Sequence, residues 1–218
     1  MYEIVALYKF TNIDEPLNFQ KILKKRLSEL KIYGTILISN EGINGTISSD
    51  SKENLSLALS LIESLKGLRN LDLKFSQSIK KPFIRLKVKL KKEIVTIGDI
   101  SINPNEIVGQ HIEPKEWNKL INDKDTIIID TRNQYECSIG TFKNSINPKT
   151  EKFSDFPGWL EDQSFSNEVK ENKKIAMFCT GGIRCEKASS LMKREGFKNV
   201  FQLKAVSYTH LTLPTTPY

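Results

Sequence analysis

The chain has 218 residues, of which 39% are apolar and 27% charged, and its formal net charge is +7 at pH 7. This composition is typical of a globular protein and excludes wholesale disorder, and the length favours two domains. No apolar run approaches the roughly 18 residues of a membrane span, and the N-terminal segment lacks the features of a signal peptide. The sequence therefore predicts a cytoplasmic protein that has no membrane partner.

Residues 1–100 predict a ferredoxin-like domain. Apolar and β-branched runs predict strands at 3–10, 34–39, 46–48 and 71–76. An Asn- and Gly-rich stretch at 40–45 predicts a turn between the second and third of these strands. Apolar residues at steps of three and four predict helices over 16–32 and up to Gly67, the second of them capped by Ser49 or Asp50. The resulting order, βαββαβ, is the split unit of ferredoxin-like folds.

A strongly basic segment follows the last of these strands. Between Lys66 and Lys92, ten Lys or Arg residues stand against a single acid, Asp72. Apolar and basic residues alternate strictly over 83–90, which predicts a strand with one apolar and one basic face. The apolar face would carry Ile84, Leu86, Val88 and Leu90, and the basic face Arg85, Lys87 and Lys89. The basic face is either a solvated strand face or a surface that contacts the phosphates of RNA without reading its sequence.

The rest of the chain predicts a second α/β domain. Two prolines and little periodicity at 101–114 predict a linker, which leaves 115–204 as the second domain. Its pattern predicts helices at 114–121 and 184–195 and buried strands at 126–130, 173–178 and 199–203. Such an order favours a central parallel sheet. Residues 205–218 carry no Lys, Arg, Asp or Glu and show no period, so we interpret them as a non-native tail.

Cys179 opens the loop CTGGIR (179–184) between a predicted parallel strand and a helix. This edge of the sheet is where α/β folds place their active sites. Gly181 and Gly182 allow the loop's backbone N–H groups to point inward, and the helix dipole and Arg184 add positive charge. These influences lower the pKa of a cysteine. The loop, including Thr180 and Ile183, therefore predicts a nucleophilic thiolate; the alternative is a buried structural cysteine.

The remaining candidate residues leave alternatives open. Three cysteines are too few for the disulfide framework of a small secreted domain. Cys185 is interpreted as a buried core residue, with a resolving thiol as the alternative, and Cys137 is assigned no role. Asp130 and Arg132 follow a neighbouring strand and either orient the loop or bind substrate, unless Arg132 simply pairs with Glu136. With only two histidines in the chain, no metal site is predicted.

Six motifs carry a family resemblance. They are NEGINGT (40–46), KEIVTIG (92–98), EPKEW (113–117), IDTRNQYE (129–136), IGTFKNSINP (139–148) and AMFCTGGIRCEKAS (176–189). In this order they resemble the bacterial tRNA uridine 5-hydroxylases, over about residues 2–204. The resemblance implies an N-terminal acylphosphatase-like (ferredoxin-like) domain, a rhodanese-like catalytic domain, and Cys179 as the active-site residue that carries a persulfide.

The same resemblance implies a reaction. It is the oxygen-dependent hydroxylation of the wobble uridine, position 34 of tRNA, to 5-hydroxyuridine, with molecular oxygen as co-substrate and no further cofactor evident. Arg85, Lys87 and Lys89 would then contact the tRNA. The family continues past FQLK (201–204) with a turn and a helix, so a C-terminally truncated rhodanese domain is expected. The alternatives are a sulfurtransferase with a cysteine persulfide, a phosphatase, which the short loop disfavours, and a non-enzymatic RNA-binding module.

Overall fold

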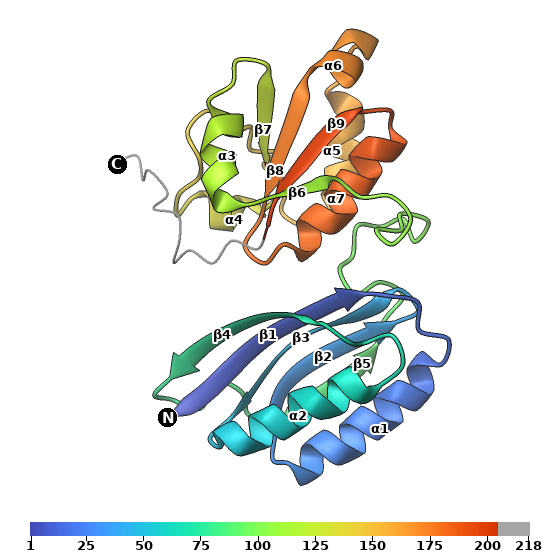
Figure 1. The fold of residues 1–218 in the computed structure, drawn as a ribbon, viewed down its shortest axis with the longest axis vertical. Helices are drawn as coiled ribbons and strands as arrows, with labels where there is room; N and C mark the ends of the chain where they lie inside the picture. Colours follow the sequence, from blue (N-terminus) through green and yellow to red (C-terminus); the bar gives the residue numbers. More distant parts are fainter. Residues whose placement is uncertain (205–218) are drawn as a thin grey trace. The chain divides into compact units, whose positions relative to one another are not determined.

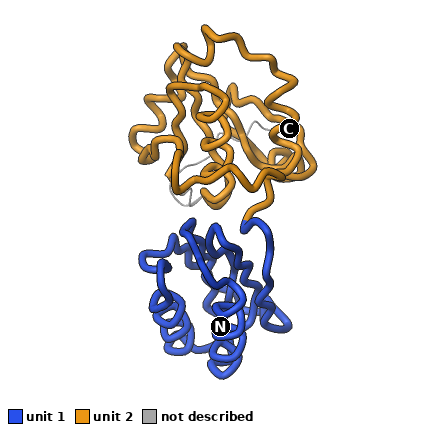
Figure 2. The backbone as a smooth tube through the Cα atoms, turned by 90° about the vertical axis from the view of Figure 1, so that its right-hand side faces the viewer, with its two compact units in different colours: residues 1–94 blue, residues 95–218 orange. Residues whose placement is uncertain are grey.

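The computed structural model describes residues 1–204, and the chain divides into two compact units, Met1–Ile94 and a second that begins at Val95 (Figure 2). The tail predicted at 205–218 lies outside the described residues. Each unit has a sheet and a core of its own. Along the described residues, no helix is long and apolar enough to cross a membrane.

In the first unit, two helices cover one face of a five-stranded sheet of order β4-β1-β3-β2-β5 (Figure 1). The elements are β1 (Tyr2–Phe10), α1 (Pro16–Glu29), β2 (Tyr33–Ser39), β3 (Gly42–Ser49), α2 (Lys52–Ser64), β4 (Asp72–Ser78) and β5 (Leu86–Leu90). Neighbouring strands among β1–β4 are antiparallel, and β5 is parallel to β2. The predicted ferredoxin-like order is confirmed, with β5 added as a fifth strand.

The core of this unit lies between the sheet and its two helices. Val5 and Leu7 of β1, Leu23 and Leu27 of α1 and Ile62 of α2 are each no more than 1% exposed. Burying such a side chain contributes about 1.5–3 kcal/mol, so the alternating strand and the amphipathic helices stabilise one another.

The first hairpin is tighter than predicted. β3 begins at Gly42, so only Asn40 and Glu41 connect it to β2, whereas the pattern predicted a turn as far as residue 45. A Cβ atom at Gly42 would lie 2.0 Å from the carbonyl oxygen of Lys9, so glycine is required by a close strand approach. The glycines of this segment therefore belong to the strand.

The helix ends also differ from the sequence pattern. Ser51, and not Ser49 or Asp50, caps α2: its side-chain oxygen accepts a hydrogen bond from the N–H of Asn54 at 3.1 Å. α1 ends at Glu29, before Lys31, whose φ of 52° is left-handed. Both helices are consequently shorter than the apolar periodicity suggested.

β5 is an edge strand whose apolar face is only partly covered. Val88 is 8% exposed, and Leu86 packs against the same core. Ile84 precedes the strand and is 92% exposed, and Leu90 is 40% exposed. The prediction that all four apolar residues face the core was wrong for Ile84 and Leu90, because α1 covers the middle of the strand, where Gln20 donates to the carbonyl of Val88.

The second unit has a parallel sheet of order β6-β9-β8-β7 (Figure 1). Its elements are β6 (Gln110–Ile112), α3 (Pro114–Ile121), β7 (Thr126–Asp130), α4 (Gln134–Cys137), a 3-10 turn (Phe153–Asp155), α5 (Phe156–Asp162), α6 (Asn167–Asn172), β8 (Lys174–Phe178), α7 (Ile183–Arg194) and β9 (Asn199–Leu203). The predicted parallel sheet is confirmed. The expected linker at 101–114 was wrong, because it contains β6 and the core residue Ile102.

Both faces of this sheet are covered. On one face, α5 and α7 pack against side chains such as Ile175 and Met177. On the other face, Trp117 of α3 lies against Phe142 and Phe178, with ring centroids 5.7 and 6.2 Å away. The carboxyl ends of β7 and β8 emerge from this packed layer, which fixes the backbone at the start of the Cys179 loop.

Candidate active site

Cys179 follows the last residue of β8 at the carboxyl edge of the parallel sheet. The loop then turns into α7, which begins at Ile183, with Gly182 at its N-cap position. Gly182 has a φ of 87°, in the left-handed region, so a side chain there would strain the turn. The structure thus places the predicted loop between a buried strand and the positive end of a helix dipole.

The surroundings of Cys179 favour the thiolate. Its side chain is 3% exposed, and its sulfur accepts a hydrogen bond from the N–H of Gly182 at 3.0 Å. Burial raises the pKa of Cys179, but a hydrogen bond from the Cys185 thiol, the positive charge of Arg184 and backbone N–H groups of the loop outweigh it and lower the pKa to about 5. A cysteine whose pKa lies this low is ionised at neutral pH, and the thiolate is the form in which cysteine acts as a nucleophile.

Cys185, in the first turn of α7, is fully buried beside Cys179. Burial and the neighbouring Cys179 raise the pKa of Cys185 well above its usual range. Its sulfur lies 3.4 Å from the hydroxyl of Thr131, which in turn donates to the carbonyl of Phe178. Cys185 is thus a protonated donor to the thiolate and also a core residue; its role as a resolving thiol stays a prediction.

Glu136 of α4 holds the far side of the loop. Its carboxylate accepts two hydrogen bonds from the guanidinium of Arg184, at 2.5 and 2.8 Å, and one from the hydroxyl of Thr180 at 2.7 Å. Burial raises the pKa of Glu136, but these bonds and the charge of Arg184 lower it to about 2. The sequence suggested a pair between Glu136 and Arg132. That alternative was wrong, and Glu136 is the site residue that the sequence missed.

Asp130 and Arg132 form a separate buried ion pair. Their side chains are 0% and 3% exposed, and Arg132 Nη2 lies 2.6 Å from Asp130 Oδ2. Arg132 also donates to the carbonyl of Gly140 at 2.6 Å, and the hydroxyl of Thr141 donates to Asp130 at 2.7 Å. The pair ties the end of β7 to the segment after α4, an arrangement that favours a structural role.

The third cysteine lies in a different environment. Cys137 is 7% exposed, and its thiol donates weakly to the carbonyl of Arg132 at 3.8 Å. Burial and the negative charge of Asp130 raise the pKa of Cys137 to about 12. It therefore stays a thiol at neutral pH and differs sharply from Cys179.

The predicted RNA-contact residues lie in the first unit. Arg85 precedes β5, and Lys87 and Lys89 lie within it; all three side chains are exposed. In the part of the chain that the structure describes, none of the three has a carboxylate partner. An exposed, unneutralised basic strand is compatible with binding of a polyanion.

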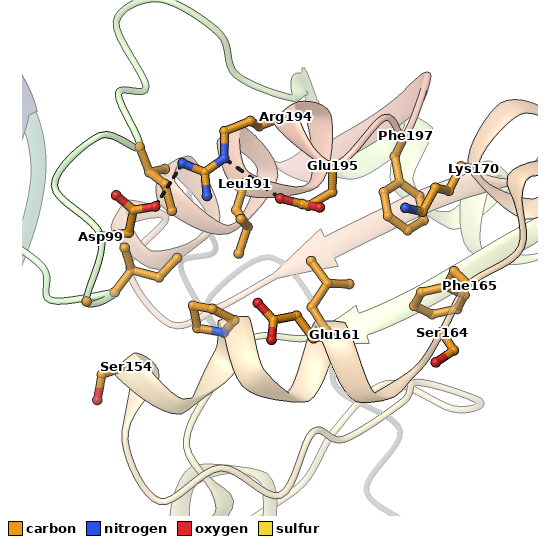
Figure 3. Close-up of a pocket in the computed structure, with 15 residues that line it drawn as sticks. Asp99, Ser154, Glu161, Ser164, Phe165, Lys170, Leu191, Arg194, Glu195 and Phe197 are labelled. Atoms are coloured by element: carbon orange, nitrogen blue, oxygen red, sulfur yellow. Dashed lines mark hydrogen bonds and ion pairs between the residues drawn. The ribbon is translucent and has the colours of Figure 1, made fainter.

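A cavity of about 390 Å³ lies in the second unit (Figure 3), and Cys179 is not among the residues that line it. Asp99 and Arg194, which line it, form an ion pair at 2.8 Å. Leu191 and Arg194, the α7 residues that line the cavity, lie eight and eleven residues beyond Ile183, so the loop and the nearer of the two are separated by roughly 12 Å along the helix. Its lining includes no residue of the loop. Among residues 1–204, no three His, Cys, Asp or Glu side chains group to hold a metal ion.

Comparison with known proteins assigns both units. Residues 2–94 match the UPF0176 acylphosphatase-like domain, and residues 113–205 match the rhodanese-like domain. Among solved structures, the chain is similar to an acylphosphatase from Bacillus subtilis, with 10% identity, a TM-score of 0.34 and coverage of 41% of this chain and 99% of that one. It is also similar to a rhodanese-related protein from Thermoplasma volcanium, with 22% identity, a TM-score of 0.36 and coverage of 44% and 84%.

Sequence relatives span both units. A protein of Prochlorococcus marinus (strain MIT 9515) is 50% identical over 208 residues, 93% of this chain and 66% of the relative. One of Rhizobium leguminosarum bv. trifolii (strain WSM2304) is 48% identical over 202 residues, 92% of this chain and 64% of the relative. Both are named tRNA uridine(34) hydroxylase, and the chain spans slightly less than two thirds of their length. The predicted resemblance to the tRNA uridine(34) hydroxylases is therefore confirmed, and it extends over both units of the chain.

Proposed function

We propose that this protein hydroxylates the wobble uridine of tRNA to 5-hydroxyuridine in an oxygen-dependent reaction. The observation that carries the proposal is the 48–50% identity to tRNA uridine(34) hydroxylases over both units. A protein that only carried sulfur would need the rhodanese-like unit alone. With tRNA as its substrate, the protein would act in the cytoplasm.

In this proposal Cys179 is the catalytic residue. Its thiolate attacks the outer sulfur of a sulfane-sulfur donor and becomes a persulfide, and the donor leaves as a thiolate. The loop amides that bind the Cys179 sulfur would then lie close to the persulfide. Arg184, held by Glu136, keeps the positive charge near it. The site thus supplies a reactive sulfur group at the edge of the sheet, against which the uridine is placed.

Hydroxylation replaces the hydrogen on C5 of uridine with a hydroxyl group. One atom of molecular oxygen enters the base and the other leaves as water, which requires two electrons and two protons from a reductant in the cell. An unpaired loop is where such a base is accessible. An unpaired base of the anticodon loop can therefore approach a site at the carboxyl edge of the sheet, which a base within a duplex could not do.

The test is nucleoside mass spectrometry of tRNA from cells that lack the full-length gene. The cells are complemented with the wild-type gene, with Cys179→Ser or with Cys137→Ser. Cys137→Ser is the matched control, since it removes a buried thiol whose pKa is raised. We expect 5-hydroxyuridine derivatives with wild type and Cys137→Ser and none with Cys179→Ser. Unchanged tRNA in the deletion strain would contradict the proposal and favour the sulfurtransferase alternative, which needs Cys179 and no RNA.

A further inference from the structure

The sheet of the first unit has a face that points away from α1 and α2. In β2, Ile36 and Ile38 belong to the core beneath the helices. The residues that alternate with them, Tyr33, Thr35 and Leu37, therefore point to the opposite face, and all three are partly exposed. This face contains no helix within the described residues of the unit (Figure 1).

β5 places a column of cations beside these three residues. Because the two strands pair in parallel, Lys87 lies next to Thr35 and Lys89 next to Leu37. Arg85 reaches the level of Tyr33, since its carbonyl accepts a hydrogen bond from the N–H of Gly34 at 3.2 Å. The six residues Tyr33, Thr35, Leu37, Arg85, Lys87 and Lys89 are called the β2–β5 array below.

The dimensions of the β2–β5 array follow from strand geometry. Side chains two residues apart on a strand are separated by roughly 6.6 Å, and neighbouring strands by about 4.8 Å. Three positive charges therefore stand at regular intervals along one edge, each beside an uncharged side chain. Lys81 adds a fourth cation, with its ammonium 3.5 Å from the ring centroid of Tyr33.

The charges of the array are not neutralised within the unit. No carboxylate pairs with Arg85, Lys87, Lys89 or Lys81 among residues 1–204. The next strand, β3, presents Asn44 and Thr46 opposite Leu37 and Thr35, so the residues that pair with the uncharged column are themselves uncharged. Like charges in one column repel one another, and a single lysine would already protect an edge strand from aggregation. Four cations beside uncharged side chains are better explained by an anionic ligand.

We propose that the β2–β5 array binds unpaired nucleotides of RNA, with its cations on successive phosphates and the bases against Tyr33, Thr35 and Leu37. Proteins that bind single strands combine a basic track along the backbone with a stacking surface for the bases. Sheet faces serve this purpose in other RNA-binding domains. A duplex would present only its phosphates to the array, so its bases would make no contact with Tyr33, Thr35 and Leu37. The inference rests on the proposed function in taking the anticodon loop as the ligand.

Binding of a fluorescent hairpin RNA with the sequence of a tRNA anticodon arm tests the inference, measured by anisotropy at several salt concentrations. The test compares two double variants. One carries Lys87→Ala and Lys89→Ala in β5, and the other carries Lys24→Ala and Lys25→Ala, which remove the same charge from exposed positions on α1. We expect the β5 variant to bind at least about fivefold more weakly, and its salt slope to fall by about 1.4, as for two phosphate contacts with a single strand. We expect the α1 variant to bind like wild type. Equal affinities of the two variants would overturn the inference.

A second measurement tests the placement of the bases without any substitution. Thiouridine in the hairpin loop is cross-linked to the wild-type chain by light, and the attached peptide is identified by mass spectrometry. We expect attachment within 33–37 or 85–89, and a fully paired RNA of equal length should give none there. Cross-links confined to other segments would overturn the inference.

Failure of this inference and failure of the proposed function are distinguishable. The binding and cross-linking experiments need no turnover, so Cys179→Ser should bind the hairpin as wild type does. If the hairpin binds through the β2–β5 array but cells that express the wild-type gene contain no 5-hydroxyuridine, only the proposed function is contradicted. If the double variant Lys87→Ala, Lys89→Ala binds the hairpin like wild type and cells that express the wild-type gene contain 5-hydroxyuridine, only the inference about the array is contradicted.

Discussion

Arg184 and Glu136 form a two-pronged ion pair that joins the Cys179 loop to α4, with N–O distances of 2.5 and 2.8 Å. Their side chains are 14% and 16% exposed, so the pair is largely buried and solvent screens it only in part. The bidentate geometry fixes the guanidinium in one orientation. The charge that stabilises the Cys179 thiolate is thereby held in place before any substrate arrives.

Arg184→Met should raise the pKa of Cys179 from about 5 by at least about one unit, because a nearby opposite charge lowers a pKa by roughly one to three units. The pH dependence of the rate of alkylation by iodoacetamide measures this pKa. Arg194→Met, at the other end of α7, is the matched control and should leave it unchanged. An unshifted alkylation profile in Arg184→Met would contradict the role of Arg184, because it would show that the loop amides and Cys185 alone keep the pKa of Cys179 low.

The hydrogen bond from Cys185 to Cys179 can be separated from core packing by two substitutions. Cys185→Ser keeps a donor, whereas Cys185→Ala removes it and leaves a slightly smaller side chain. We expect the pKa of Cys179 to rise in Cys185→Ala and to stay near its wild-type value in Cys185→Ser, measured by the same alkylation profile. Equal values for the two variants would mean that the donor contributes nothing.

Glu136 makes the stability of the second unit depend on pH. Its pKa is lowered from 4.5 to about 2 on folding, so its contribution is complete above about pH 5 and is lost as the pH falls toward 2. Partial exposure reduces this contribution to roughly 2 kcal/mol. Both tryptophans, Trp117 and Trp159, lie in the second unit, so their fluorescence in urea reports its unfolding.

The measurement compares wild type with Glu136→Gln at pH 7 and pH 3. The variant should lose less stability between the two values, because its amide does not titrate. Glu53→Gln alters an exposed carboxylate in the first turn of α2 and should leave the fluorescence transition as in wild type. Parallel pH profiles for wild type and Glu136→Gln would contradict the assigned role of the pair.

The buried pair of Asp130 and Arg132 should matter for folding more than for chemistry. Arg132→Met leaves a buried carboxylate without its cation and should cost about 3–5 kcal/mol. Arg194→Met breaks a partly exposed pair with Asp99 and should cost at most about 1 kcal/mol. Asp130→Asn combined with Arg132→Met should recover part of the loss in the tryptophan-monitored urea transition. A destabilisation as small as that of Arg194→Met would refute the structural role.

Local patterns predicted most of the strands and helices, because alternation and helical spacing reflect which face is buried. α3, β7 and β9 begin and end where the pattern placed them. The prediction of a linker was wrong because Gln110–Ile112 form β6, and a strand of three residues is too short to show an alternation of apolar and polar residues. α4–α6 were likewise too short to be separated from irregular chain.

The loop around Cys179 was predictable, but its partner was not. Strand, glycines and arginine are contiguous in the sequence and fix the local geometry. Glu136 lies 48 residues before Arg184, so only the folded sheet brings them together. The spacing of Arg132 and Glu136 suggested a pair, but Arg132 precedes the N-cap of α4 and points instead to Asp130.

The central claim is that Cys179 supports the insertion of one atom of molecular oxygen into uridine 34 of tRNA. Growth of cells under oxygen-18 gas tests this claim most directly. The cells lack the full-length gene and carry wild type or Cys179→Ser, and their tRNA nucleosides are analysed by mass spectrometry. The account predicts a 5-hydroxyuridine derivative that carries one oxygen-18 atom with wild type, and none with Cys179→Ser. Unlabelled 5-hydroxyuridine, or labelled nucleoside at wild-type levels in Cys179→Ser, would contradict it.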